Sequence, residues 1–270
     1  RAFQLQGDMA DAKVRLQLAF SLGQWPTEPA SQALAQLLAT QPADPFLTTA
    51  IFSSALPHLK NLARTTDPAT RLQLLPFAIK SGDREVLATL IAPALAPDST
   101  LDDTARWQLW AAFLRDLEKD TPASLITAAP DDRLSRLLRD SDRLINAART
   151  QLESPTTDLQ KQTLAATVLG LHPPTRALAL DFLAQSLRTQ LQSESWHTLL
   201  TAFAEVAASE PAFATTTLAV WPSLTPAQRS QTLDALTTRP AWTRALLTAL
   251  ESKTLRPAEI DPTRRLALLN

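Results

Sequence analysis

The sequence predicts an all-α protein, a right-handed α-solenoid of stacked helix pairs with about fourteen helices. Capping residues followed by proline mark helix starts along the chain, a short segment recurs, and glycine is scarce. There are 4 glycines in 270 residues, where average usage of roughly 7% would give about 19. Sheets with tight hairpins and glycine-rich ligand loops are hard to build from this composition.

Four pairs of a capping residue and a proline predict helix starts. In each pair a side-chain oxygen can accept a hydrogen bond from the first turn, and proline at the first helical position misses no N–H. Gln228, three residues after Thr225, completes a capping box. The pairs are Asp44-Pro45, Asp67-Pro68, Thr225-Pro226 and Asp261-Pro262.

Glycines and internal prolines predict where helices end or bend. Gly23, Gly82 and Gly170 each close an apolar run and are expected to be C-caps. Pro76 and Pro93 lie inside apolar runs, where each is expected to kink or divide its helix.

A short unit recurs along the chain. Segment 11–18 reappears at 67–74 with the aspartate, the arginine and the Leu-Gln-Leu triplet in the same places. A third copy at 261–268 keeps the aspartate, the arginine and both leucines, and segment 158–170 matches 11–23 in length. Such reuse is typical of helix-pair repeats, which bury a continuous core by stacking.

The same unit alternates apolar and polar residues at 14–18 and 71–75, as a half-buried strand does. The aspartate cap before each run and the high Ala and Leu content favour helices. Leu18 and Leu74 are equivalent in two copies, so both are expected to be buried between helices.

The unit resembles part of the HEAT repeat family. The Asp-x-x-Val-Arg start at 11–15, with the apolar helix after it and the helix at 30–39, is similar to the second helix of one HEAT repeat and the first of the next. In that family the aspartate caps the helix and the arginine often reaches the aspartate of a neighbouring repeat. Thr48 stands where Asp44 would need an arginine, so the ladder is broken there. The matching positions are Asp11, Arg15, Asp67, Arg71, Asp261 and Arg265.

Residues 1–270 are expected to form a single HEAT-like solenoid. Thr121-Pro122 and Ala129-Pro130 bracket a short helical segment near 121–131. It is either a hinge between two half-solenoids or an irregular repeat, and the variable loops of solenoids favour the irregular repeat.

Composition argues against several partners. Lys plus Arg is 26 against 27 for Asp plus Glu, so no net field attracts nucleic acid or anionic lipid. The longest apolar runs, such as 87–95, are too short for a membrane span. With 0 cysteines there is no thiolate ligand and no cysteine nucleophile.

No residue pattern predicts chemistry. His58, His172 and His197 are scattered, and each is expected to be a surface or capping histidine. The four glycines exclude phosphate-binding loops and nucleophile elbows. We therefore predict no catalytic residue, no metal ligand and no cofactor.

Two aspartate pairs resemble the magnesium-binding pairs of all-α enzymes. Such a motif needs a further carboxylate where Arg106 and Ser135 stand, and the helix dipole alone favours acids in a first turn. The pairs are therefore expected to be caps; they are Asp102-Asp103 and Asp131-Asp132.

A series of arginines could form a phosphate-binding stripe. However, Asp132 precedes Arg136 by four residues and Asp140 follows it by four, while Asp142 follows Arg139 by three. These spacings predict intrahelical ion pairs on a solvated face. The arginines are Arg133, Arg136, Arg139, Arg143 and Arg149.

Aromatic residues are expected to be structural. Trp107, Trp110 and Phe113 form a helical stripe typical of a core. The remaining tryptophans stand near predicted helix ends and are expected to seal seams between repeats; they are Trp25, Trp196, Trp221 and Trp242.

The favoured function is a non-catalytic scaffold or spacer that presents a protein-interaction surface. Segments 14–23 and 255–269 resemble the HEAT-like part of large secreted bacterial proteins that also carry a sorbosone-dehydrogenase-like β-propeller and a c-type cytochrome. The resemblance implies a periplasmic or secreted location and flanking redox domains as partners. Residues 255–270 would then be an incomplete repeat, continued beyond Asn270 towards the cytochrome domain.

Two alternatives remain open. A HEAT-like protein can bind nucleic acid along a basic concave face. An α-helical toroid hydrolase would need two carboxylates roughly 5 to 10 Å apart in one pocket.

Overall fold

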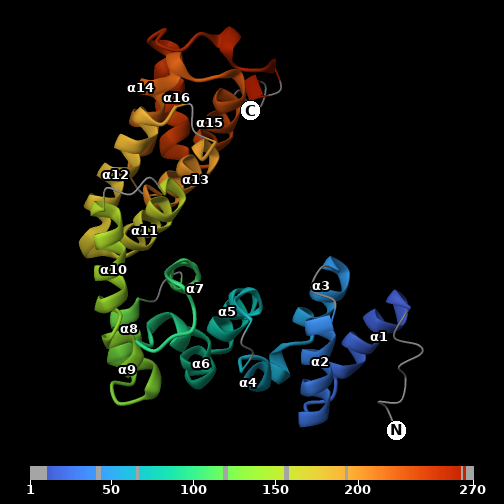
Figure 1. The fold of residues 1–270 in the computed structure, drawn as a ribbon. Helices are drawn as coiled ribbons and strands as arrows, with labels where there is room; N and C mark the ends of the chain where they lie inside the picture. Colours follow the sequence, from blue (N-terminus) through green and yellow to red (C-terminus); the bar gives the residue numbers. More distant parts are fainter. Residues whose placement is uncertain are drawn as a thin grey trace. The chain divides into compact units, whose positions relative to one another are not determined.

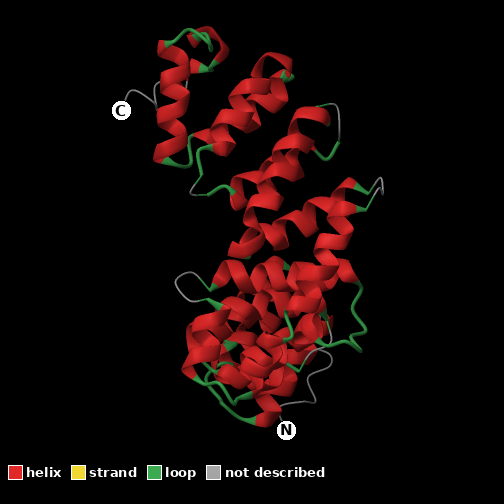
Figure 2. Ribbon diagram, turned by 90° about the vertical axis from the view of Figure 1, so that its left-hand side faces the viewer, coloured by secondary structure: helices red, strands yellow, loops and turns green. Residues whose placement is uncertain are grey.

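The computed structural model describes residues 11–40, 44–64, 67–117, 121–154, 158–191, 194–208, 210–262 and 264–265. Every regular element in these ranges is a helix, from α1 to α16 (Figure 1). Figure 2 shows the helices joined by short loops. This confirms the all-α prediction, including the helices at 14–18 and 71–75. No described helix is both long and apolar enough to cross a membrane.

The chain divides into two compact units, Arg1–Leu144 and Ile145–Asn270. The first contains α1 (Ala12–Leu22), α2 (Glu28–Thr40), α3 (Pro45–Ser53), the 3₁₀-helix η2 (Leu56–His58), α4 (Leu59–Leu62), α5 (Pro68–Ser81), α6 (Arg84–Leu95), α7 (Asp103–Asp116), α8 (Pro122–Ala128) and α9 (Arg133–Arg139). The division falls within α10 (Asp142–Glu153). The segment 121–131 forms α8 and its following turn, inside the first unit.

Helices of the second unit stack in two rows. They are α11 (Leu159–Leu171), η3 (Pro173–Thr175), α12 (Arg176–Thr189), α13 (Trp196–Val206), α14 (Ala212–Val220), η4 (Trp221–Ser223), α15 (Pro226–Leu236), α16 (Pro240–Glu251) and η5 (Pro257–Glu259). One row runs α11, α13, α15 and the other α12, α14, α16, so each helix packs on the second helix after it (Figure 1). This is a helical-repeat-like arrangement.

The first unit follows this pattern only in part, since α3 makes few contacts with α5 and α4 makes few with α6. Helix α1 packs on α3, α2 on α4, and α5 on α7, while α6 packs on α9 because α8 is inserted between them. Helix α4 has only 4 residues, against 13 in α2 and 12 in α6. The helix that packs on α2 is therefore only about one turn long.

The residues predicted from the sequence to cap helix starts do so in the structure. Asp44 and Asp67 accept hydrogen bonds from the first turns of α3 and α5. Thr225 and Gln228 form the predicted capping box of α15. The carboxylate of Asp261 accepts from the Arg264 amide at 3.0 Å.

The glycine prediction is right for Gly23, the C-cap of α1, and for Gly82, which ends α5 with a φ of 67°, but it is wrong for Gly170, which lies inside α11. A Cβ added to Gly170 would lie 2.3 Å from Val206 Cγ1 in α13. At Gly23 the same atom would lie 2.5 Å from the Cβ of Ser54, which follows α3. Gly23 and Gly170 are therefore required for the close approach of a helix to the second one after it.

Core packing confirms part of the burial predictions. Leu74 is fully buried, but Leu18 is only half-buried, because α5 has helices on both sides whereas α1 contacts α2 and α3 among the described elements. Trp107, Trp110 and Phe113 are all buried, as predicted.

Of the four remaining tryptophans, Trp196, Trp221 and Trp242 are buried as expected. Trp25 is 56% exposed, so its predicted role in sealing a seam is wrong. The leucines on which the incomplete-repeat prediction depends, at 266, 268 and 269, lie outside the described residues.

Candidate functional site

The short α4 leaves a groove in the first unit. Its volume is about 620 Å³, and its walls come from the C-terminal half of α2, from α3, from α4 and the turn after it, and from the first turns of α5. We call it the α2–α5 groove. It is lined by Ala35, Leu38, Ala39, Thr48, Asn61, Leu62, Arg64, Asp67, Ala69, Thr70 and Gln73.

The floor of the groove is apolar. Ala35, Leu38 and Ala39 lie three and four residues apart on α2, so they share one face of that helix. Ala35 and Ala39 are exposed and Leu38 is half-buried, although the N-terminal half of the same helix packs on α4 and η2.

Two charged side chains lie on the rim of the groove, Asp67 and Arg64, and they differ in their hydrogen bonding. Asp67 caps α5 and accepts from the Thr70 hydroxyl and amide, at 2.5 and 2.8 Å. The Thr70 hydroxyl lowers the pKa of Asp67 below its ordinary value. The Arg64 guanidinium is exposed and makes no ion pair or side-chain hydrogen bond with the residues that the structure describes.

A second, polar hollow of about 520 Å³ adjoins the groove and shares Asn61 and Arg64 with it. Two carboxylates line it. Glu28 accepts from Asn61 Nδ2 at 2.7 Å, and Asp83 caps α6 and pairs with Lys60 at 3.6 Å. Both acids therefore hold neighbouring helices in place.

His58 lines this hollow but is buried, so it is not a surface histidine. Its Nε2 donates to the Leu22 carbonyl at 3.1 Å, and its Nδ1 pairs with the Ser31 hydroxyl at 2.7 Å. His58 thus caps the C-terminus of α1 from inside the core, which agrees with the capping part of its prediction.

The other predicted candidates lie apart. Asp102 and Asp132 cap α7 and α9, as expected of these aspartate pairs. His197 is exposed on α13, and His172 follows α11 beside Thr175. Within the described ranges, no group of three or more His, Asp and Glu side chains could hold a metal ion.

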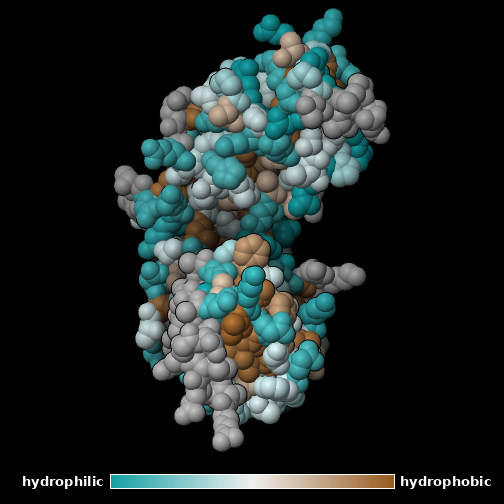
Figure 3. Space-filling model, turned by 90° about the vertical axis from the view of Figure 1, so that its right-hand side faces the viewer, coloured by the Kyte–Doolittle hydropathy of each residue, from teal (hydrophilic) through white to brown (hydrophobic). Residues whose placement is uncertain are grey.

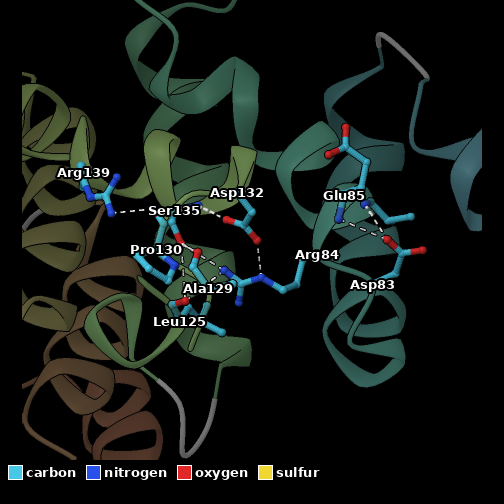
Figure 4. A network of polar contacts seen from close by, with 10 residues as sticks. Asp83, Arg84, Glu85, Leu125, Ala129, Pro130, Asp132, Ser135 and Arg139 are labelled. Atoms are coloured by element: carbon cyan, nitrogen blue, oxygen red, sulfur yellow. Dashed lines mark hydrogen bonds and ion pairs between the residues drawn. The ribbon is translucent and has the colours of Figure 1, made fainter. Parts of the chain in front are cut away.

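Arginine pairing differs from the prediction, because the ion pairs run between helices. Asp132 bonds to Arg84 of α6, not to Arg136 (Figure 4). Arg84 also donates to the Leu125 carbonyl at 2.9 Å and to the Ser135 hydroxyl at 3.1 Å. This network joins α6, α8 and α9, and sequence spacing within one helix could not reveal it.

Beside this network, Arg133 of α9 pairs with Glu85 of α6 at 2.7 Å. The Arg139 guanidinium donates to the Pro130 carbonyl at 2.6 Å. Two of the arginines proposed as a phosphate-binding stripe therefore hold α6, α9 and the turn between α8 and α9.

Replacing Asp132 should change how the unfolding free energy depends on pH in the acidic range. Hydrogen bonding from Arg84 lowers the pKa of Asp132 far below its ordinary value. This interaction therefore stabilises the fold above about pH 4, and the stability is lost as pH falls below that value. We expect the unfolding free energy of Asp132→Asn to fall less steeply than wild type between about pH 5 and pH 2.

Urea unfolding at several pH values measures this slope. The matched control is Asp131→Asn, which removes an exposed neighbouring carboxylate. Equal slopes for wild type and Asp132→Asn would mean that the pair with Arg84 does not contribute to stability.

Arg71 bonds to main-chain carbonyls, whereas the HEAT resemblance implied a contact with the aspartate of a neighbouring repeat. This side chain is buried, and its Nη1 donates to the carbonyls of Thr89 at 3.1 Å and Leu90 at 3.4 Å. Burial lowers the pKa of Arg71 from its ordinary value. Pro93 has no N–H for the Thr89 carbonyl, so Arg71 satisfies the acceptor that the proline leaves open. Pro93 and Pro76 both lie within continuous helices, so neither divides its helix.

Replacing Arg71 should show that its contribution to the unfolding free energy depends on Pro93. We expect Arg71→Met to reduce the unfolding free energy by about 1–3 kcal/mol, because a buried carbonyl loses its donor. In a Pro93→Ala background the loss should be smaller, since the alanine N–H restores the helical bond. A double-mutant cycle in urea measures the difference, and an equal loss in both backgrounds would contradict this role.

In the third copy of the recurring unit, the arginine that bonds to carboxylates lies one residue before the position expected from the other copies. Arg265 is exposed, whereas Arg264 bonds to Asp234 of α15 and pairs with Asp261 at 2.6 Å. Hydrogen bonds from these two carboxylates raise the pKa of Arg264. Comparison of the three copies of the unit therefore pointed to Arg265, whereas the neighbouring Arg264 makes the contacts.

Exposed apolar side chains concentrate in the first unit. Figure 3, which views the side that carries α1, shows hydrophobic residues gathered there. A contiguous apolar patch on a soluble protein often marks an interaction site. The exposed large residues between 14 and 56 are Val14, Phe20, Trp25, Phe46 and Leu56.

Comparisons of the chain with protein families, with curated proteins and with solved structures gave no match. The resemblance to HEAT-like segments of secreted redox proteins therefore remains a prediction from the sequence.

Proposed function

We propose that the chain is a non-catalytic scaffold that binds a protein partner in the α2–α5 groove. The observation that carries this proposal is the short α4, which leaves an apolar face of α2 open between polar rims. Binding sites typically combine an apolar floor with a few polar groups that fix orientation. The stacked helices provide the rigid support, and we propose that they form a HEAT-like solenoid.

Two structural features favour this proposal over the alternatives. Of the five arginines considered as a phosphate-binding stripe, Arg133 pairs with Glu85 and Arg139 bonds to the Pro130 carbonyl, and this disfavours a continuous stripe. Glu28 and Asp83, the two acids of the polar hollow, are already bonded to neighbouring helices, which disfavours a two-carboxylate hydrolase.

We further propose, from the sequence resemblance, that the scaffold positions redox domains in the same polypeptide. The reading frame around this segment tests that part directly. A propeller or a Cys-x-x-Cys-His haem motif next to it would support the mounting role, and an unrelated neighbouring domain would contradict it.

The groove itself is tested by photo-crosslinking in cells that produce the protein. A photo-reactive residue replaces Ala35, which is exposed on the groove floor. We expect one discrete protein adduct, and we expect Leu38→Glu to abolish it, because a carboxylate on the floor disfavours an apolar partner.

Two controls separate the groove from the general surface. The same photo-reactive residue at Ala123, exposed on α8, should give no such adduct. Leu178→Glu alters a leucine of α12 that is 38% exposed and should leave the adduct at Ala35 unchanged. No adduct at Ala35, or an adduct that survives Leu38→Glu, would contradict the proposed function.

A further inference from the structure

We infer that the occupant of the α2–α5 groove is an amphipathic α-helix of a partner protein that presents a carboxylate to Arg64. This inference rests on the proposed function, and it specifies the partner by conformation and charge.

The shape of the groove favours a helix. Helices of the second unit pack on the second helix after them, whereas α2 meets an α4 of only 4 residues. The open part presents Ala35, Leu38 and Ala39, a ridge with the spacing on which a second helix packs. A partner helix of about two to three turns would be long enough to cover this open part of α2.

The charge of the rim favours an acidic residue on that helix. Arg64 is the exposed cation of the groove, and within the described part of the chain it has no carboxylate partner. Asp67, the acid on the same rim, is engaged in capping α5. A carboxylate of the partner would therefore meet Arg64 without competition from Asp67.

Other kinds of occupant fit less well. A peptide that binds by strand addition needs a sheet edge, and the described residues contain no strand. A nucleic acid needs several cations along its backbone, whereas this groove has Arg64 alone above an apolar floor. The helix-in-groove mode, with anchors spaced three and four residues apart, matches both the floor and the rim.

The test uses a display library of alanine-rich, helix-forming peptides of about 14 residues, with one face randomised. Selection on the purified chain should enrich peptides with apolar residues at helical spacing and one Asp or Glu. For an enriched peptide we expect Leu38→Glu to weaken binding at least tenfold, and Leu178→Glu to leave it unchanged.

A charge exchange tests the contact with Arg64. Arg64→Glu should weaken binding of the acidic peptide at least threefold, and replacing the peptide's acid by Lys should restore binding to that variant only. Enriched peptides that lack helical spacing, or a charge exchange without recovery, would overturn the inference.

The photo-crosslinking experiment distinguishes the two proposals. An adduct at Ala35 together with non-helical or basic peptides would keep the scaffold function and overturn the acidic helix. An adduct of two copies of this chain would also overturn it, because the occupant would be the protein itself. Absence of any groove-dependent adduct contradicts the proposed function, whatever the peptides show.

Discussion

Replacing Trp242 by alanine should reduce the unfolding free energy by about 3–5 kcal/mol. The side chain is fully buried on α16, its ring lies 4.4 Å from that of Phe213, and Phe213 lies 5.5 Å from Phe203. Its indole N–H donates to the Glu210 carbonyl at 3.1 Å. The substitution therefore removes the α16 member of an aromatic cluster that joins α13, α14 and α16, and it leaves a cavity.

The matched control is Trp25→Ala. Trp25 is 56% exposed, so the same change in side chain should cost less than about 0.5 kcal/mol. Urea unfolding followed by circular dichroism measures both variants. Comparable losses would mean that the second unit does not depend on the packing of α13, α14 and α16.

The sequence predicted local structure well because local structure here depends on neighbours in the chain. Asp44, Asp67 and Thr225 cap helices through bonds to residues two or three positions away. Such bonds need only the right residue at the right spacing. The helix starts could therefore be predicted, whereas what packs beside each helix could not.

Contacts between helices explain the wrong predictions. Gly170 looked like a C-cap, but the reason for a glycine there is Val206, far along the chain. Asp132 pairs with Arg84, which is also far away in sequence, instead of with the nearby Arg136. Neither partner follows from spacing within a helix.

The groove had one signal in the sequence that could have revealed it. The predicted starts at Asp44 and Asp67 are close together, and the interval holds α3, a 3₁₀ turn and the four residues of α4. A full helix pair does not fit in that interval. The irregular spacing of capping residues thus predicts where a row of helices is incomplete, although not which side chains line the opening.

Equivalent residues of the recurring unit should respond differently to the same substitution. Leu74→Ala should cost about 2–5 kcal/mol, because Leu74 is fully buried and α5 has helices packed on both sides. Leu18→Ala should cost about 1 kcal/mol, because half-buried Leu18 exchanges less apolar surface with water. Urea unfolding of the two variants measures the ratio. Equal losses would contradict the environment described for α1 and would mean that a further part of the protein covers Leu18 as completely as α5's neighbours cover Leu74.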